Sequence, residues 1–411
     1  MLNTHEHLLS GRPDGWTVSS LNKIATRIES GGTPSRYVPA YWNGSIPWVT
    51  PGELTGHGDK YLRSTRDRIT SQGCAASAAR VVPVDSLIVT TRATIGSVAL
   101  AGVPLSTNQG FKSIVFRGGC DPHFFYHLFK ILKPEMVRRA SGTTFLEISR
   151  REFGLINVPL PPLSEQRRIA EILDSVDEAI RSTEHLVGKA STVSFALRRQ
   201  LLLGNGLPDA NRSSARIGDV LVRAEYGISS PLGHGAGVPV LRMNNLKGGE
   251  VDTADLKYTV FPVPQRLFLN YKDVLFNRTN SLDHVGRTSI WRGAAGTTTF
   301  ASYLVRLVQD ERTILPEYLT LWLNLDEVQI EMRRFATPGV HQVNINPTNL
   351  KKVRIDFPHS LEQQEAICRQ IAASDPPVTQ ARSELAKLEQ LKQGLMEDLL
   401  TGRVRVPAER A

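Results

Sequence analysis

Two long parts of this chain resemble each other in the same order along the sequence. DSLIVTTRATIGSVALAG from Asp85 matches DVLFNRTNSLDHVGRTSIWRG from Asp273, and DPHFFYHLFK from Asp121 matches LPEYLTLWLN from Leu315. Residues 140–163 match 336–361, residues 197–204 match 391–402, and the offset stays at roughly 188 to 198 residues. Four chance matches in one order are improbable, so the sequence predicts a duplicated unit.

Each copy has the pattern of a mixed α/β globule followed by one long helix. Short β-rich runs such as SLIVTTR, KSIVFRG and ASYLVRLV alternate with clusters of Gly, Pro, Asn and Ser, a spacing typical of strands joined by turns. An internal helix is predicted near 122–133 in the first copy and 316–333 in the second. We therefore expect an α+β protein with mixed α/β domains at 1–163 and 205–360, long helices at 164–204 and 361–403, and a tail at 404–411.

The first long helix has a clear start and a regular apolar stripe. Ser164 is a suitable N-cap, and heptad a positions fall at Ile169, Val176, Thr183, Ala190 and Leu197, with d positions from Ile172 to Gln200. About 40 residues would span about 60 Å. The stripe needs a partner, and the second copy offers one. We expect helix–helix packing by Ile169, Ile172, Val176, Leu186 and Leu197 against Leu385, Leu388, Leu395 and Leu399.

The order of the parts predicts an antiparallel coiled coil with pseudo-twofold symmetry. The first helix carries the chain away from the first globule to the second, and the second helix must return along it. The globules are then expected at opposite ends of the helix pair. SDPPV at 374–378 interrupts the second helical pattern, so a kink or a short break is expected near residue 375.

The charge of the chain points to a polyanionic partner. The net charge of +9 over 411 residues is concentrated in residues 1–163 (+7) and 204–360 (+3), whereas the long helical segments 164–203 and 361–402 carry 0 and −3. The sequence has no apolar run long enough for a membrane span and no visible export signal at its start. We expect a cytoplasmic protein.

Four stretches resemble a known family. They are PLPPLSEQRRIAEILDSVDEAI at 159–180, SGTTFLEIS at 141–149, LEQQEAI at 361–367 and LMEDLLTGRVRV at 395–406. Together with the duplication they resemble the specificity subunit of a type I restriction-modification system. The resemblance implies a non-catalytic protein in which each globule is a target recognition domain. Each domain would read one half of a bipartite, asymmetric target in double-stranded DNA.

The resemblance also implies partners. The two helices would set the gap between half-sites and dock two modification (methyltransferase) subunits, and restriction (endonuclease and translocase) subunits would join them. S-adenosylmethionine, ATP and magnesium are expected in those partner subunits, and no cofactor or metal is expected in this chain. Alternatives are a specificity subunit for a related fused nuclease-methyltransferase and a free-standing enzyme.

Base edges are read mainly by Arg, Lys, Asn and Gln, while phosphates are held by basic, hydroxyl and amide groups. Loops rich in these residues occur at matching places in both copies. The DNA-contact candidates in the first domain are Arg36, Tyr37, Thr91, Arg92, Asn108, Gln109, Thr143 and Thr144. In the second domain they are Tyr226, Asn244, Asn245, Arg278, Asn280, Ser281, His341 and Gln342.

Three other motifs do not support a catalytic or metal site. SDPPV lacks the aromatic residue of the methyltransferase D-P-P-aromatic motif, and no glycine-rich cofactor loop accompanies it. His123 and His127 have zinc-compatible spacing but lack the glutamate of HExxH. GHGAG at 233–237 lacks the lysine of a phosphate loop.

Overall fold

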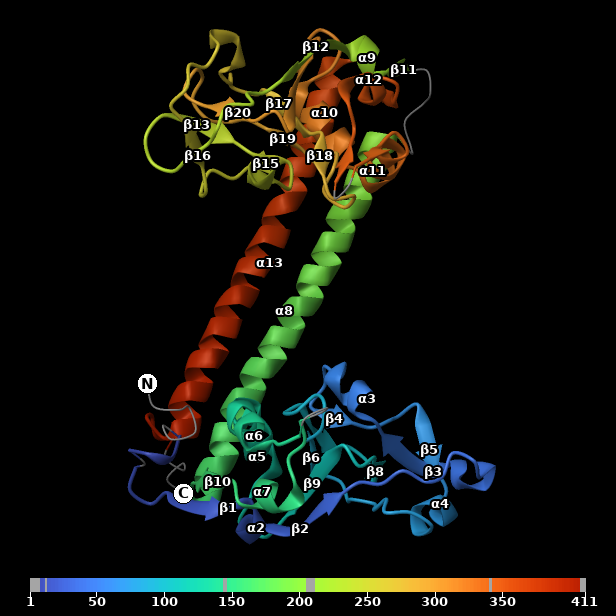
Figure 1. The fold of residues 1–411 in the computed structure, drawn as a ribbon, viewed down its shortest axis with the longest axis vertical. Coiled ribbons are helices and arrows are strands. Elements are labelled where there is room, and N and C mark those ends of the chain that lie inside the picture. Colours follow the sequence, from blue (N-terminus) through green and yellow to red (C-terminus); the bar gives the residue numbers. More distant parts are fainter. Residues whose placement is uncertain (1–7, 12, 143–145, 205–210, 340–341, 407–411) are drawn as a thin grey trace. The chain divides into compact units, whose positions relative to one another are not determined.

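The computed structural model describes residues 8–11, 13–142, 146–204, 211–339 and 342–406. The chain divides into two compact units (Figure 1). Unit 1 comprises Met1–Glu184 with Ser383–Ala411, and unit 2 comprises His185–Arg382. Each unit contains one mixed α/β head and parts of two 41-residue helices, α8 (Leu163–Leu203) and α13 (Leu361–Thr401). We call residues 13–162 head 1 and residues 211–360 head 2.

Head 1 contains two main sheets and a strand pair that precedes α8. The pair joins β1 (Thr17–Ser20) to β10 (Asn157–Leu160). A five-stranded sheet has the order β2-β9-β6-β7-β4, and a three-stranded sheet has the order β5-β3-β8. Their bounds are β2 Ala25–Ser30, β3 Trp42–Val49, β4 Tyr61–Leu62, β5 Asp67–Ile69, β6 Leu87–Thr90, β7 Val98–Ala101, β8 Ser106–Thr107 and β9 Phe111–Phe116.

Head 2 repeats this topology. The strand pair is β11 (Arg212–Arg216) with β24 (Arg354–Pro358). The sheets have the orders β12-β21-β17-β19-β15-β14 and β16-β13-β20, and a small sheet β18-β23-β22 is added. Their bounds are β12 Leu221–Tyr226, β13 Val238–Leu241, β14 Leu246–Lys247, β15 Glu250–Val251, β16 Lys257–Thr259, β17 Val274–Asn277, β18 Thr279–Asn280, β19 Thr288–Ile290, β20 Thr299–Phe300, β21 Leu304–Gln309, β22 Thr337–Pro338 and β23 Val343–Asn344.

The repeat extends to details of strand pairing. β4 pairs with β7 in parallel, as β15 does with β19, and β3 pairs with β8 in parallel, as β13 does with β20. The first strand of each large sheet, β2 or β12, also carries a register shift. The internal repeat predicted from the sequence is therefore confirmed.

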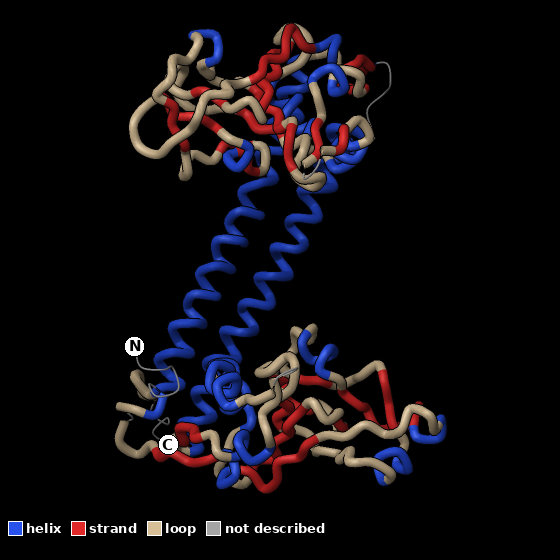
Figure 2. Tube along the Cα trace, in the orientation of Figure 1, coloured by secondary structure: helices blue, strands red, loops and turns tan. Residues whose placement is uncertain are grey.

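The helices of each head follow local sequence signals (Figure 2). In head 1 they are α2 (Leu21–Ile24), α3 (Pro51–Thr55), α4 (Ser71–Ala75), α5 (Pro122–Ile131), α6 (Lys133–Arg139) and α7 (Arg150–Gly154). In head 2 they are α9 (Ile217–Val220), α10 (Pro316–Leu323), α11 (Asp326–Arg333) and α12 (Pro347–Leu350). α5 starts where the Asp121 carboxylate accepts bonds from the His123 and Phe124 amides. α5 and α10 begin with a proline, which suits the first helical turn.

The same glutamine fixes the start of each long helix. The fully buried Gln166 side chain accepts from the Asp121 amide at 2.8 Å and donates to the carbonyls of Gly119 and Pro161. Gln364 accepts from the Leu315 amide at 2.9 Å and donates to the carbonyls of Thr313 and Pro358. One amide thus satisfies three buried backbone groups and ties each long helix to the start of α5 or α10. The glutamine that the two copies share, Gln166 in LSEQ and Gln364 in LEQQ, has this physical role.

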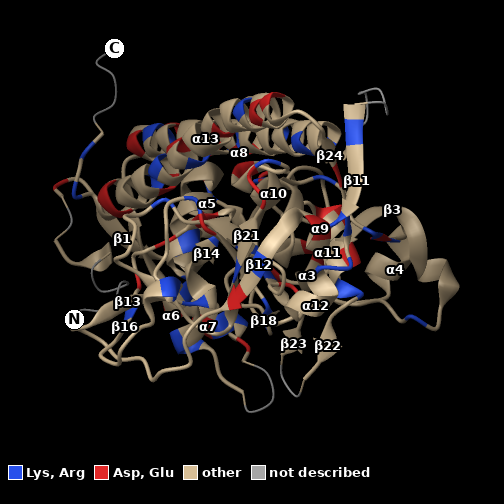
Figure 3. Ribbon diagram, turned by 90° about the horizontal axis from the view of Figure 1, so that it is seen from above, with Lys and Arg blue, Asp and Glu red and all other residues tan. Residues whose placement is uncertain are grey.

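The two long helices pack antiparallel inside each unit. In unit 1, Leu399 and Leu400 share the core with Ile169 and Leu173, and Lys392 pairs with Asp177. In unit 2, Ile367 and Ile371 share the core with Leu202, and Arg198 pairs with Asp375. Basic and acidic residues both occur along α8 and α13, as their near-neutral sequences require (Figure 3).

The buried seam of α8 corrects the predicted heptad. The a positions are buried or half-buried, including Ile169, Val176 and Leu197, but the predicted d residue Leu186 is 58% exposed. The second row of the seam lies one residue further on. It is formed by Leu173, Ile180, Val187, Ser194 and Leu201, which are buried or half-buried, and the predicted Ile172 is half-buried and packs against the core of unit 1. On α13, Leu399 is buried and Leu385, Leu388 and Leu395 are half-buried.

The break predicted near residue 375 does not occur. α13 is one continuous helix with Pro376 and Pro377 inside it. Both prolines are exposed, so water can reach the carbonyls that their missing N–H groups leave free. The Thr379 hydroxyl donates to the Asp375 carbonyl at 3.1 Å and the Ser374 hydroxyl to the Ile371 carbonyl at 2.7 Å. Among the described residues, no helix has both the length and the apolar character needed to cross a membrane.

Candidate nucleic-acid interface

Several predicted DNA-contact loops of head 1 meet at one end of the five-stranded sheet, where its strands β2 and β6 end and β9 begins. Ser30 at the end of β2 pairs with Lys112 of β9, and Thr90 at the end of β6 pairs with Phe111 of β9. The loops that leave β2 and β6 and the loop that enters β9 therefore emerge together. These loops carry Arg36 and Tyr37, Arg92, and Asn108 and Gln109.

Arg36 is held in a fixed orientation in the first of these loops. Its guanidinium lies 3.6 Å from the ring centroid of Trp42, and its Nη2 is 2.5 Å from the Asp67 carboxylate. The neighbouring Tyr37 is 97% exposed. A guanidinium that is stacked and paired on one side keeps its other N–H groups available in a fixed direction, which suits the reading of a base edge.

Gln109 and Arg92 lie beside this loop. Gln109 Oε1 accepts from the Thr33 hydroxyl at 2.6 Å, while Asn108 Oδ1 accepts from the Gly110 amide at 2.8 Å. The exposed Arg92 forms a bridge with Glu147 and lies 3.7 Å from its carboxylate. Asn108 therefore shapes a turn, whereas Gln109 and Arg92 remain near the surface.

Thr91 is placed differently from its prediction. Its side chain is fully buried, donates to the Gly110 carbonyl and accepts from the buried Lys112 ammonium at 3.4 Å. Burial lowers the pKa of Lys112, and Glu147 opposes that shift. Since alternate side chains of a strand end point to opposite faces, Thr91 supports the loop from inside and Arg92 faces outward.

The corresponding edge of head 2 carries Tyr226 and Arg278. Tyr226 of β12 pairs with Val305 of β21, and Asn277 of β17 pairs with Leu304. The Arg278 guanidinium lies 4.9 Å from the Tyr226 ring centroid. Both heads therefore present an arginine over an aromatic ring, through different strands.

Asn244, Asn280 and Ser281 line one crevice of about 530 Å³ in head 2. Two cations that are not among the sequence candidates, Lys247 and Arg287, line the same crevice. Both are exposed, and none of the ion pairs found among the described residues involves them. Lys247 stands three residues after the candidate Asn244, so the sequence could have indicated it as a member of the same loop. Arg287 lies in the β18–β19 connection that also carries Ser281, and the fold brings that connection beside Asn244.

Asn245 is a structural residue and not a surface contact. It is 3% exposed, its Oδ1 accepts from the Arg242 amide at 2.8 Å, and its Nδ2 donates to the carbonyls of Asp252 and Asp255. These bonds close the turn that starts at Arg242. The prediction failed because Asn caps turns with the same amide that reads adenine.

A β-hairpin approaches the arginine loop in each head. Bridges join Glu147 to both Arg92 and Ser141 in head 1, and β23 pairs with both β18 and β22 in head 2. Gln342 lines a second crevice of about 820 Å³ with Arg278. The candidates Thr143, Thr144 and His341 lie outside the described residues.

A separate charged cluster joins head 1 to α8. Lys60 Nζ is 2.6 Å from both carboxylate oxygens of Asp174, and His127 Nε2 is 2.8 Å from Asp174 Oδ1. Asp177 pairs with Lys130 and Lys392. Burial would raise the pKa of Asp174, but hydrogen bonds from His123, His127 and Lys60 lower it well below its usual range. Burial lowers the pKa of His127, so it is neutral and donates to Asp174.

Ligand atoms of His127, Asp174 and Asp177 lie within 4.8 Å of one another. Three ammonium groups, however, already pair with the two carboxylates. A metal ion would have to displace these lysines, so the cluster is suited to an internal ion-pair network.

Residues 13–187 match the family described as the type I restriction modification DNA specificity domain. The MjaIX specificity subunit of Methanocaldococcus jannaschii is 33% identical over 172 residues, which are 41% of this chain and 40% of that protein. The EcoKI specificity subunit of Escherichia coli is 23% identical over 425 residues, covering 95% of this chain and 89% of that protein. The alignment with the MjaIX protein thus spans less than half of that relative.

The fold also resembles solved structures. The type I S subunit of M. genitalium aligns with a TM-score of 0.55 and 13% identity over 95% of this chain and 97% of that chain. A chain from a study of complex assembly in a type I restriction-modification system aligns with a TM-score of 0.61 and 19% identity, covering 96% and 99%.

Proposed function

We propose that this chain, whose residues 13–187 match the type I restriction modification DNA specificity domain, selects a DNA sequence in two parts, one with each head. Two heads of the same topology with different loop residues carry this proposal. Arg36 on Trp42 and Arg278 on Tyr226 are presented by different strands and have different neighbours. Two unlike half-sites follow from unlike reading loops.

The basic surplus of the heads supports a DNA partner. Both heads are positive while the long helical segments are neutral or negative. Phosphate contacts supply most of the salt-dependent affinity of a DNA-binding protein, and base contacts supply its selectivity. We assign base reading to Arg36, Arg92 and Gln109 in head 1 and to Asn244, Arg278 and Asn280 in head 2, with Lys247 and Arg287 on phosphates.

The chemistry of modification and cleavage is assigned to partner chains. The chain would be a non-catalytic subunit that docks two modification subunits through its long helices, and restriction subunits would join them. S-adenosylmethionine, ATP and magnesium would then bind to those subunits. Among the described residues, the group whose spacing could hold a metal ion is His127, Asp174 and Asp177, and its two carboxylates are paired with lysines.

A head exchange tests the proposal. Residues 1–160 are replaced by those of a relative with another specificity, and the host genome is sequenced for methylated sites in the presence of the modification subunit. We expect only one half of the recognised sequence to change. A single exchange that alters both halves would contradict the assignment of one half-site to each head.

A matched control keeps both heads and adds about two helical turns to α8 and to α13. This change is expected to lengthen only the gap between the half-sites. Unchanged spacing would show that the helices do not set the gap.

The alternative partner is a fused nuclease-methyltransferase, for which the same heads would serve one catalytic chain. The genes beside this one distinguish the two cases, because separate modification and restriction genes favour the first. Turnover by the purified chain alone would instead indicate a free-standing enzyme.

A further inference from the structure

The two heads meet the long helices at equivalent places, and the repeat assigns matching residues. The pairings Tyr61 with Leu100 and Glu250 with Ile290 place Gly249 at the position of Lys60. The buried glutamines Gln166 and Gln364 place Ala372 at the position of Asp174. The starts of α5 and α10, which these glutamines hold, place Leu321 at the position of His127.

The Lys60–Asp174–His127 network is therefore absent from unit 2. Glycine, alanine and leucine stand in its place, and Gly249 has φ +95°, which disfavours any side chain there. An ion pair between the long helices adjoins both places: Asp375 stands at the position of Asp177, while its partner Arg198 stands one helical turn from the position of Lys392. At this place the two units therefore differ in the side chains between head and helix.

A cavity of about 580 Å³ lies at this place in unit 2. Its walls come from α10, α13, the β15 edge and β19, and they include Ile290, Leu315, Leu321, Cys368 and Ile371. Burial is the main cause that raises the pKa of the Cys368 thiol to about 12, so it is a neutral wall group. A cavity of this size falls within the range of about 300 to 1,000 Å³ typical of sites for small ligands.

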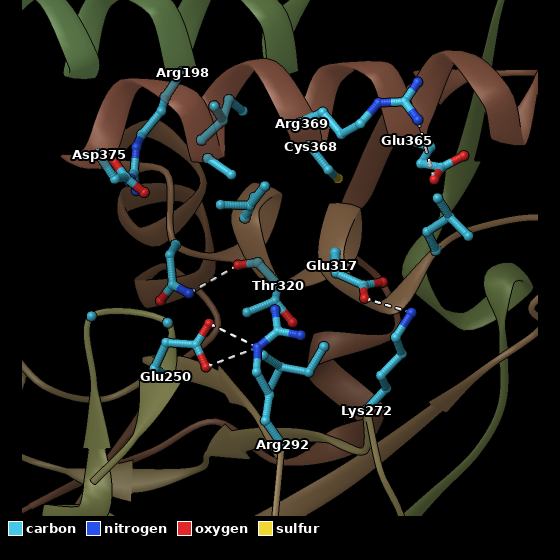
Figure 4. A pocket seen from close by; sticks show the side chains of 18 of the residues that line it. Arg198, Glu250, Lys272, Arg292, Glu317, Thr320, Glu365, Cys368, Arg369 and Asp375 are labelled. Carbon is cyan, nitrogen blue, oxygen red and sulfur yellow. Dashed lines mark hydrogen bonds and ion pairs between the residues drawn. The ribbon is translucent and has the colours of Figure 1, made fainter.

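Eight of the nine charged residues that line the cavity form ion pairs (Figure 4), and the ninth, Glu362, is exposed at its rim. Lys272 lies 2.8 Å from Glu317, Arg292 lies 3.2 Å from Glu250, Arg369 lies 3.4 Å from Glu365, and Arg198 pairs with Asp375. The Thr320 hydroxyl donates to the Pro316 carbonyl at 2.8 Å, and Asn324 Nδ2 donates to the Thr288 carbonyl at 2.7 Å. A charged ligand would have to break one of these pairs, whereas an apolar group would bury the walls without that loss.

We propose that this cavity binds an uncharged, mainly apolar group between α10 and α13, in the space that the Lys60–Asp174–His127 network fills in unit 1. The bound group would fasten α13 to head 2, as that network fastens α8 to head 1. A free small molecule and an apolar side chain of a partner subunit share this chemistry. The small-molecule case is independent of the proposed function, and the partner case rests on it.

The probe is indole, titrated into the purified full-length chain by calorimetry and by NMR of labelled methyl groups. We expect saturable binding, with shifts at Ile290, Leu321 and Ile371. Ala372→Phe fills the cavity from α13 and should weaken binding at least tenfold. Ala373→Phe is the matched control, because Ala373 is exposed on the same helix and does not line the cavity, and it should bind indole like the wild type.

Failure of the wild type to bind indole, or equal binding by the wild type and Ala372→Phe, would overturn the proposal. Circular dichroism and thermal melting of both variants show whether they fold.

Adding the modification subunit distinguishes the two possible occupants, a free small molecule and a side chain of that subunit. If its side chain fills the cavity, the assembled complex should no longer bind indole and Ala372→Phe should weaken assembly. If indole still binds, the source is a small molecule. Failure to assemble with the wild type would count against the proposed function and leave the indole result standing.

Discussion

The junction of head 1 with α8 and that of head 2 with α13 share their backbone contacts but differ in the side chains that fill them. Both junctions keep the buried glutamine, Gln166 or Gln364, and both have an ion pair between the long helices. Junction 1 is filled by Lys60, Asp174 and His127, and junction 2 contains the cavity. Groups that satisfy backbone atoms are thus repeated, while space-filling groups have diverged, because several sets of side chains can fill one space.

Unit 1 has a further clamp without a counterpart at the matching residue of unit 2. Glu165 is 3% exposed and accepts from Trp16 Nε1 at 2.9 Å and from Nε and Nη2 of Arg405. The matching Gln363 is exposed. Through Arg405, the segment after α13 is therefore bonded to the start of α8 in unit 1.

The largest difference between the junctions should come from Asp174→Ala. The substitution leaves the largely buried Lys60 ammonium and His127 without their acceptor, and a broken buried pair costs about 3 kcal/mol or more. Native-state hydrogen exchange should show this loss in the amides of α5. Ala372→Gly at the matching site of unit 2 should cost about 1 kcal/mol, from helix propensity alone. Equal losses at both sites would refute the difference.

Gln166→Leu and Gln364→Leu test what the junctions share. Each leaves one buried N–H and two carbonyls without the glutamine, so each should cost about 2 to 3 kcal/mol of local stability. Exchange rates in α5 and α10 report the two effects separately. If only one variant is destabilised, the two glutamines are not equivalent. Gln363→Leu, at an exposed position beside Gln364, is the control.

The two ion pairs between the long helices should differ modestly in how much they contribute to the free energy of unfolding. Asp177 and Lys392 are 12% and 22% exposed, and Asp375 and Arg198 are 45% and 33% exposed. Asp177→Asn should therefore cost about 1 to 2 kcal/mol, and Asp375→Asn under about 1 kcal/mol. Urea unfolding of each variant measures which substitution lowers the free energy of unfolding more. A larger effect of Asp375→Asn would contradict it.

Acidification should loosen junction 1 before junction 2. The lowered pKa of Asp174 gives stability that is present above its unfolded value near 4 and is lost as the pH falls below it. The lowered pKa of His127 acts in the same direction, with its contribution lost as the pH falls below about 6.5. After correction for the intrinsic exchange rate, the protection of α5 should therefore fall relative to that of α10 as the pH drops from 7 to about 3, with the His127 part first and the Asp174 part below about pH 4. Asp174→Asn should remove the part below about pH 4, and an unchanged pH dependence there would contradict this assignment.

Sequence periodicity located the long helices and most of their packing residues, but it misplaced Leu186. A 3.5-residue repeat allows two neighbouring rows to serve as the seam, and burial selected the row of Leu173 and Ile180 over that of Leu186. Pro376 and Pro377 signal a helix break by their local chemistry. α13 continues through them because they lie on an exposed face of a helix that is held on both sides by packing.

Loop residues were the least predictable part. Asn245 and Thr91 belong to types that contact DNA and also cap turns, and only their burial decides between the roles. Arg287 could not be linked to Asn244 from the sequence, because their shared crevice forms only when separate loops meet. Arg36, Gln109 and Arg278 lie in loops beside strand ends, where recognition residues are common, and their contacts with DNA stay a prediction.

The sequence by itself determined the duplication, the two mixed α/β heads and the two long helices, because hydrophobic period, turn residues and helix starts are local signals that each copy repeats. Tertiary structure alone decided which helix rows face each other, which polar side chains are buried, and that one junction holds an ion network while the other holds a cavity. Those outcomes depend on contacts between residues far apart in the chain, such as Lys60 with Asp174 and Arg198 with Asp375, whose partners no local pattern specifies.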